Sequence, residues 1–131
     1  MDRAAVRAGL AQFVRFALVG AANTAVSYGV IWLLAPRLGV PAASAVGYGA
    51  GVAQSFVLNR FWTFGATRAA GKTRLAGEAL RFVLVNIVCG AIFSAFTTAA
   101  VPHIGLLAAT VGGVALVTPL GFILNRFVVF R

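Results

Sequence analysis

Four long runs without a charged residue divide the chain, and shorter segments with polar residues separate them. The runs cover residues 16–35, 40–58, 82–101 and 106–124. A helix rises about 1.5 Å per residue, so roughly 20 apolar residues cross a hydrocarbon layer about 30 Å thick. The pattern therefore predicts an all-α integral membrane protein with four transmembrane helices.

The connections between these runs predict how the helices are paired. The first and second runs are joined by "PRLGVP", and the third and fourth by "PHIG". Short turns with proline and glycine make neighbouring helices antiparallel, so we expect two helical hairpins. Between the hairpins we expect a basic loop over residues 65–80.

The second hairpin repeats the first in sequence. Residues 15–65 align with residues 81–131 without a gap, at a shift of 66 residues, and 16 of the 51 pairs are identical. The motif "LNRF" closes both copies. Because each copy has an even number of spans, both copies start on the same side of the membrane and are parallel repeats. The chain is therefore predicted to be a single transmembrane domain over residues 1–131.

Composition and charge add an orientation to this picture. The chain is 61% hydrophobic and 10% charged, with a mean hydropathy of +0.97. Of its 11 Lys and Arg, Arg37 alone lies between the first and second runs, and the others flank the opposite ends of the spans. The positive-inside rule then predicts that both termini and the central loop are cytoplasmic. The net charge of +9 is expected to attract anionic membrane lipids rather than nucleic acid.

Acidic residues and cysteine are too few for several kinds of chemistry. The two acids, Asp2 and Glu78, both fall in predicted cytoplasmic segments, and the single Cys89 lies in an apolar run. Without a carboxylate in a span, the sequence predicts no catalytic acid–base pair, no metal site, no cofactor and no proton relay. It therefore argues against an enzyme and against a small multidrug exporter. The one-sided charge argues against a dual-topology channel.

Small and amide residues recur at helical spacing inside the runs. Gly47 and Gly51 in the second run and Gly113 in the fourth would let helix backbones approach closely, within the chain or in a homodimer. Asn23 and Asn86 lie in the first and third runs. Two interpretations stay open for the polar faces: packing through side-chain hydrogen bonds, or a groove for a lipid headgroup.

Each repeat ends in an Asn-Arg pair followed by aromatic residues, as "LNRFWTF" at 58–64 and "LNRFVVF" at 124–130. Arginine at a helix end, beside aromatic rings, is typical of a membrane-interface anchor. Guanidinium and amide groups also suit a phosphate, so both interpretations stay open. The candidate ligands for the phosphate or headgroup are Asn59, Arg60, Asn125, Arg126, Arg15, Arg81, Asn23 and Asn86. The candidate anchors are Trp62, Phe64 and Phe130.

Three segments of this sequence together resemble the GtrA-like family of bacterial cell-surface polysaccharide proteins: "RFALVGAANTAVSY" at 15–28, "FVLNRFWTF" at 56–64 and "RFVLVN" at 81–86. The family's motif positions match Arg15, Phe16, Gly20, Asn23, Asn59, Arg60, Trp62 and Phe64. The second copy departs from the pattern, with Asn86 and Val128 at the positions of Gly20 and Trp62.

The resemblance implies a function in the bacterial cytoplasmic membrane. Such proteins are expected to flip a polyprenyl-phosphate sugar from the cytoplasmic to the outer leaflet for glycosylation of cell-envelope polymers. The resemblance implies no catalytic residues. An alternative is a non-transporting anchor or adaptor that recruits a polyprenyl-phosphate glycosyltransferase through residues 67–78.

Overall fold

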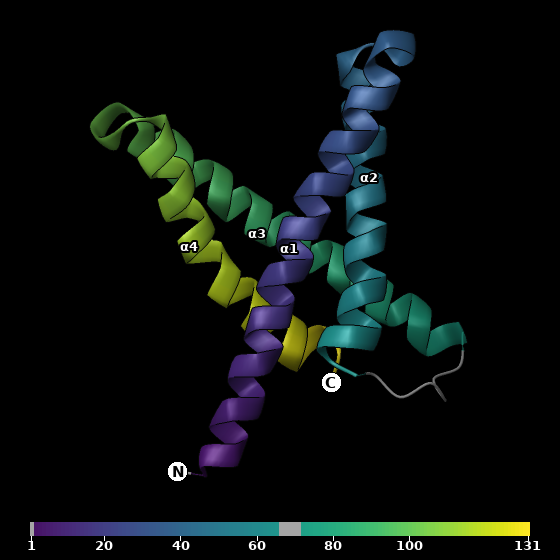
Figure 1. The fold of residues 1–131 in the computed structure, drawn as a ribbon, viewed down its shortest axis with the longest axis vertical. Helices are drawn as coiled ribbons and strands as arrows, with labels where there is room; N and C mark the ends of the chain where they lie inside the picture. Colours follow the sequence, from purple (N-terminus) through teal and green to yellow (C-terminus); the bar gives the residue numbers. More distant parts are fainter. Residues whose placement is uncertain (1, 66–71) are drawn as a thin grey trace. The chain divides into compact units, whose positions relative to one another are not determined.

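The computed structural model describes residues 2–65 and 72–131, and these form two compact units. Unit 1 is Met1–Thr67 and unit 2 is Arg68–Arg131. The described chain is helical except near the unit ends and at two glycines, which confirms the all-α fold class (Figure 1). Its elements are α1 (Arg3–Leu38), α2 (Val40–Leu58), η1 (Asn59–Thr63), α3 (Lys72–Ile104), α4 (Leu106–Leu124) and η2 (Asn125–Val129).

Each unit is a helical hairpin whose turn is one glycine. Gly39 joins α1 to α2 with φ 78°, and Gly105 joins α3 to α4 with φ 80°. Glycine adopts this backbone at little steric cost, whereas other residues do not. The turns are even shorter than the segments "PRLGVP" and "PHIG" suggested, because Pro36 and Pro102 lie inside α1 and α3. A proline in the last turns of a helix removes only one hydrogen bond there, and the helix continues to the glycine.

The first helix of each unit is longer than the apolar run that predicted it. In α1 the helix begins at Arg3, where the Asp2 carboxylate accepts a hydrogen bond from the Ala4 N–H at 3.0 Å. Because α3 begins at Lys72, residues 72–80 are helical and the predicted loop over 65–80 is wrong there. An ion pair one turn apart, between Arg74 and Glu78, supports the helix in this segment. The remainder of the predicted loop, residues 66–71, lies outside the described residues.

Three helices among the described residues are long and apolar enough to cross a membrane. They span Arg3–Leu38, Arg74–Ile104 and Leu106–Val129. The fourth expected span, α2, is not one of them, because it carries glycines, serines and Gln54 in place of large apolar side chains. Since α2 packs along α1 in the hairpin of unit 1, we infer that it crosses the layer together with α1.

Glycines of α2 let it approach α1 closely. A Cβ built on Gly47 would lie 2.7 Å from Ile31 Cγ1 and 2.8 Å from the Ser27 carbonyl oxygen. A Cβ on Gly51 would collide with the side chains of Asn23 and Ser27. Membrane helices associate through such small-residue contacts, because lipid is as apolar as the side chains it would replace.

Gly113 has a comparable position in unit 2. A Cβ on Gly113 of α4 would lie 2.8 Å from the Phe93 ring and 3.1 Å from the Thr97 hydroxyl oxygen. Ala109, one turn earlier, is fully buried. At Gly113, α4 therefore packs against an aromatic side chain of α3. At Gly47, α2 packs against the backbone of α1 as well as a side chain.

Candidate functional site

Both hairpins end in a π-helical turn. The Phe64 N–H donates to the Asn59 carbonyl at 2.9 Å, and the Phe130 N–H donates to the Asn125 carbonyl at 2.9 Å. This five-residue spacing is rare and often occurs at functional sites. In the sequence, the charge-free runs end at Leu58 and Leu124. The repeated motif after them is the only feature of the sequence that marks the π-helical turns.

Asn59 and Asn125 begin these turns and are buried, each 2% exposed. The Asn59 amide donates to the Ser55 hydroxyl at 3.3 Å, and the Asn125 amide donates to the Gly121 carbonyl at 2.7 Å. Their side-chain oxygens are buried and find no hydrogen-bond partner in the described parts of the chain. Both amides therefore point their donors into their own helix, in matching positions of the two units.

The neighbouring arginines differ between the units. Arg60 is only 4% exposed, and its guanidinium carbon lies 4.9 Å from the centre of the Phe61 ring. Arg126 is exposed, and its guanidinium carbon lies 5.5 Å from the centre of the Phe127 ring. A guanidinium over an aromatic face gains a cation–π attraction. Equivalent positions of the two repeats thus present one buried and one exposed cation.

The arginine that begins each repeat reaches the π-helical turn that ends it. Arg15 Nη1 donates to the Trp62 carbonyl at 3.3 Å, and Arg81 Nη2 donates to the Val129 carbonyl at 3.4 Å. The last carbonyls of a helix have no partner within it, and a basic side chain can supply one. The structure therefore brings Arg15 and Arg81 onto the segments that contain the Asn-Arg motifs.

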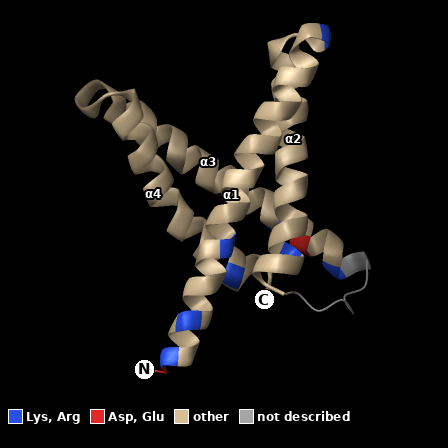
Figure 2. Ribbon diagram, viewed as in Figure 1, with Lys and Arg blue, Asp and Glu red and all other residues tan. Residues whose placement is uncertain are grey.

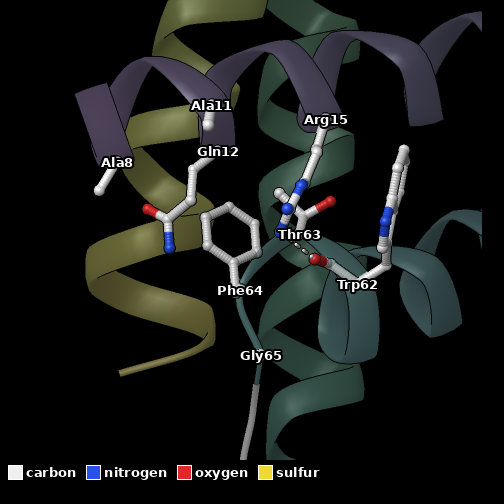
Figure 3. Close-up of a pocket in the computed structure, with 8 residues that line it drawn as sticks. All are labelled: Ala8, Ala11, Gln12, Arg15, Trp62, Thr63, Phe64 and Gly65. Atoms are coloured by element: carbon white, nitrogen blue, oxygen red, sulfur yellow. Dashed lines mark hydrogen bonds between the residues drawn. The ribbon is translucent and has the colours of Figure 1, made fainter. Parts of the chain in front are cut away.

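A pocket of about 310 Å³ lies beside Arg15 in unit 1 (Figure 3). Its lining residues come from the start of α1 and from η1 with the residues after it: Ala8, Ala11, Gln12, Arg15, Trp62, Thr63, Phe64 and Gly65. Figure 3 shows the Arg15 side chain between the Trp62 and Phe64 rings. Thr63 is 2% exposed, and its hydroxyl has no hydrogen-bond partner within the described residues.

Two polar residues of this pocket were not predicted from the sequence. Gln12 lies three residues before Arg15, so the two share a helix face, and that spacing was a usable signal. Thr63 gave no comparable signal, because its burial follows from the π-helical turn. Trp62, expected as an interface anchor, is 45% exposed and also lines the pocket.

Unit 2 carries an ion pair where unit 1 has this pocket. At the shift of 66 residues, Ala8 and Gln12 correspond to Arg74 and Glu78, and Gly65 corresponds to Arg131. Arg74 pairs with the Glu78 carboxylate at 3.2 Å and donates to the Arg131 carbonyl at 3.1 Å. Arg74 therefore links the first turns of α3 to Arg131. The corresponding segments of unit 1 line the pocket.

Glu78 itself corrects an expectation from the sequence. It was placed in a cytoplasmic loop, whereas it lies in α3 and is only 1% exposed. The sequence gives no indication of its burial, because the charged residues around it suggest a solvated segment. The contact with Arg74 compensates part of the cost of burying its charge.

The remaining candidates, Asn23 and Asn86, are not among the residues that line the pocket. Asn23 accepts a hydrogen bond from the Ser27 hydroxyl at 3.4 Å, and it lies eight residues or about 12 Å along α1 from Arg15. Asn86 donates to the Phe82 carbonyl at 2.8 Å. Both amides therefore make hydrogen bonds within their own helix.

Two predicted anchors have ring contacts inside their units. The Phe64 and Phe16 ring centres are 6.3 Å apart in unit 1. The Phe130 and Phe82 ring centres are 6.1 Å apart in unit 2. Tilted aromatic pairs at this separation are favourable, so each holds the end of its hairpin against the start of the first helix.

Basic residues gather at the end of unit 1 that carries the pocket. Figure 2 shows the Lys and Arg positions of α1 toward its N-terminal end, with one more at the turn into α2. That one is Arg37, in the last turn of α1. Since α2 runs back along α1, Arg60 in η1 lies at the same end as Arg15. One end of the hairpin is therefore basic and wide enough to hold a small ligand.

Apolar helices of spanning length, paired in hairpins, define a helical membrane protein. The family described as "GtrA/DPMS, transmembrane domain" matches residues 15–130, so the chain belongs to this family, as the resemblance indicated. The chain is also 36% identical over 123 residues to the "Uncharacterized membrane protein YngA" of Bacillus subtilis (strain 168), covering 88% of this chain and 77% of that protein.

Family membership supports a coarse statement about function. The protein is a transmembrane protein of a family associated with glycosyl-lipid processes, whose members are generally not catalysts.

Proposed function

We propose that the protein moves a polyprenyl-phosphate-linked sugar across the bacterial cytoplasmic membrane, for glycosylation of cell-envelope polysaccharide. The observation that carries this proposal is the pocket of unit 1, where Arg15 lies beside about 310 Å³ of space at the basic end of an apolar hairpin. A phosphate needs charged donors, whereas a prenyl chain needs only lipid-like surface.

The charge distribution supports a cytoplasmic pocket. By the positive-inside rule, the end of unit 1 that carries Arg15 and Arg60 faces the cytoplasm and Arg37 faces outward. The lipid-linked sugar would bind at this inner end, and its prenyl chain would remain in the bilayer. Consumption of the sugar outside would set the direction of net movement, because the proposed step breaks no bond.

In this proposal Arg15 contacts the phosphate in the pocket of unit 1 and Arg60 adds positive charge at the same end of that unit. Arg81 and Arg126 are the corresponding residues of unit 2. Asn59 and Asn125 position the π-helical turns, since their amide N–H groups already donate within the helix. Membership of the GtrA/DPMS transmembrane family supports the membrane and glycosyl-lipid context, and the sugar is unspecified.

The test is transbilayer movement of a labelled polyprenyl-phosphate sugar in proteoliposomes. We expect movement that depends on the protein and that falls at least about tenfold in the variant Arg15→Ala, because Arg15 lines the pocket and hydrogen bonds to charged groups contribute about 1.5–3 kcal/mol. Arg37→Ala is the matched control, since it removes an arginine at the opposite end of α1. We expect it to leave movement unchanged.

Movement equal to that of empty liposomes, for several sugars, would contradict translocation. The adaptor hypothesis would then replace it, and a glycosyltransferase should co-purify with the protein under gentle extraction. Its expected contact over residues 67–78 lies outside the described residues up to residue 71 and continues into α3.

A further inference from the structure

We propose that unit 1 alone binds the phosphate of the lipid headgroup, in the pocket beside Arg15, and that the Arg74–Glu78 pair closes the corresponding position of unit 2. The protein would then hold one headgroup per chain although its sequence contains the hairpin twice. This inference rests on the proposed function for the identity of the ligand, a phosphate ester carried by a lipid.

The pocket of unit 1 offers hydrogen-bond donors to an anion. Among the described residues that line it, Arg15 is the only charged one. Of the described residues, Trp62 accepts one hydrogen bond from Arg15. A guanidinium has five N–H donors in a fixed fork, so further donors can contact a phosphate in the bidentate manner.

Neutral side chains complete the set of donors. The Gln12 amide and the Thr63 hydroxyl both line the pocket. Thr63 is buried with its hydroxyl unpaired within the described residues, and leaving such a group unsatisfied destabilises the folded protein. A bound phosphate oxygen would accept this hydrogen bond and remove the destabilisation.

The same positions of unit 2 oppose an anion. Glu78 stands where unit 1 has Gln12, and its carboxylate would repel a phosphate. Arg74 stands where unit 1 has Ala8, and it already contacts both Glu78 and the Arg131 carbonyl. Ala8 and Gln12 leave the pocket of unit 1 open. The ion pair of Arg74 and Glu78 at the corresponding positions therefore closes the site in unit 2.

Trp62 favours a lipid as the source of the phosphate. It is 45% exposed, lines the pocket and lies in the turn that ends the hairpin. Tryptophan rings collect at the headgroup level of membranes, with an apolar body and a polar N–H. A pocket walled by such a ring lies where lipid phosphates are. Its volume is at the lower end of the range for small-ligand sites, about 300–1,000 Å³, which suits a headgroup rather than a whole lipid.

Trp62 also provides the readout. The chain has two tryptophans, so Trp32→Phe leaves Trp62 as the only one. Trp32 lies 17 residues beyond Arg15 in α1, or about 26 Å along the helix. The purified Trp32→Phe protein in detergent would be titrated with polyprenyl phosphate while Trp62 emission is recorded. Parallel titrations would use polyprenol without phosphate and inorganic phosphate.

We expect a saturable change in Trp62 emission with polyprenyl phosphate at one ligand per chain, and none with polyprenol. Inorganic phosphate should require far higher concentrations. An equal response to inorganic phosphate would overturn the assignment to a lipid, and an equal response to polyprenol would overturn the assignment to a phosphate.

Exchanging the side chains at these positions between the two units tests whether unit 1 alone binds the phosphate. Ala8→Arg with Gln12→Glu copies unit 2 into unit 1, and we expect affinity for polyprenyl phosphate to fall at least tenfold. Gln12→Glu alone serves if the double variant fails to fold, because it places a carboxylate beside Arg15. Arg74→Ala with Glu78→Gln copies unit 1 into unit 2, and it should leave the Trp62 response unchanged. Undiminished affinity in folded Gln12→Glu protein would overturn the proposal.

Failure of this inference is distinguishable from failure of the proposed function. Protein-dependent movement of the lipid-linked sugar without any Trp62 response would retain translocation and overturn the pocket. A saturable Trp62 response in a protein that moves no lipid would retain the pocket and overturn translocation.

Discussion

Arg15 in unit 1 and Arg81 in unit 2 occupy matching positions and make nearly the same contact, each donating to a carbonyl of its π-helical turn. One turn of helix earlier the units diverge, since Gln12 in unit 1 corresponds to the buried Glu78 in unit 2. The repeated fold therefore retains a framework, and a few side chains decide whether that framework encloses a pocket or an ion pair. Repetition of a motif predicts repeated geometry, and it does not predict repeated binding.

The largest expected effect concerns how the two hairpins pack. Gly47→Val should destabilise the protein more than Gly113→Val, because the added side chain meets the Ser27 backbone in unit 1 and a ring that can rotate in unit 2. Overpacking costs about 1–3 kcal/mol, and we place Gly47 at the upper end of that range. Thermal unfolding in detergent would measure both.

Gly49→Val is the matched control for packing, because a Cβ at that position of α2 meets nothing within 4 Å. It should leave the melting temperature close to that of the unsubstituted protein. Equal melting temperatures for Gly47→Val and Gly49→Val would contradict the described interface between α1 and α2.

A smaller but more specific effect distinguishes the two arginines. Arg15→Ala should weaken binding of polyprenyl phosphate at least about tenfold, since it removes a charged donor from the pocket. Arg81→Ala removes a similar carbonyl contact in unit 2, where the Arg74–Glu78 pair takes the positions that line the pocket in unit 1, so affinity should change less than about twofold. Calorimetric titration of both variants would compare them, and equal losses of affinity would show that the units bind alike.

The smallest expected effect concerns the two ring pairs. Phe64→Ala and Phe130→Ala each remove one aromatic contact, which contributes about 0.5–1.5 kcal/mol beyond its buried area. We expect similar decreases in melting temperature for the two variants. Only Phe64→Ala should also lower affinity for polyprenyl phosphate, because Phe64 lines the pocket. A loss of affinity in Phe130→Ala of the same size would argue that unit 2 binds the ligand.

Much of the fold was predictable because it follows from local physical rules. Charge-free runs of spanning length predicted the helices, and the all-α class and the family are confirmed. The turns are shorter than the sequence suggested, because it does not reveal that a helix continues past Pro36 and Pro102. The start of α3 was also missed, because its first turns are charged and resemble a loop.

The site was only partly predictable. Arg15, Arg81 and the Asn-Arg motifs could be selected because charged and amide side chains are rare in an apolar chain. The π-helical turns, the buried Thr63 and the pairing of Arg74 with Glu78 depend on which residues meet when a hairpin closes. Some of these contacts join residues about 50 positions apart in the chain. The Arg74–Glu78 pair lies in a charged segment whose composition is typical of a solvated loop, so the sequence does not predict that Glu78 is buried.

The most direct test of one-sided binding is the number of polyprenyl phosphate molecules bound per chain, measured by native mass spectrometry on the protein released from detergent. We expect one in the unsubstituted protein and none in the folded variant with Ala8→Arg and Gln12→Glu. Two bound molecules per unsubstituted chain, or one retained by that variant, would contradict the assignment of the headgroup to unit 1.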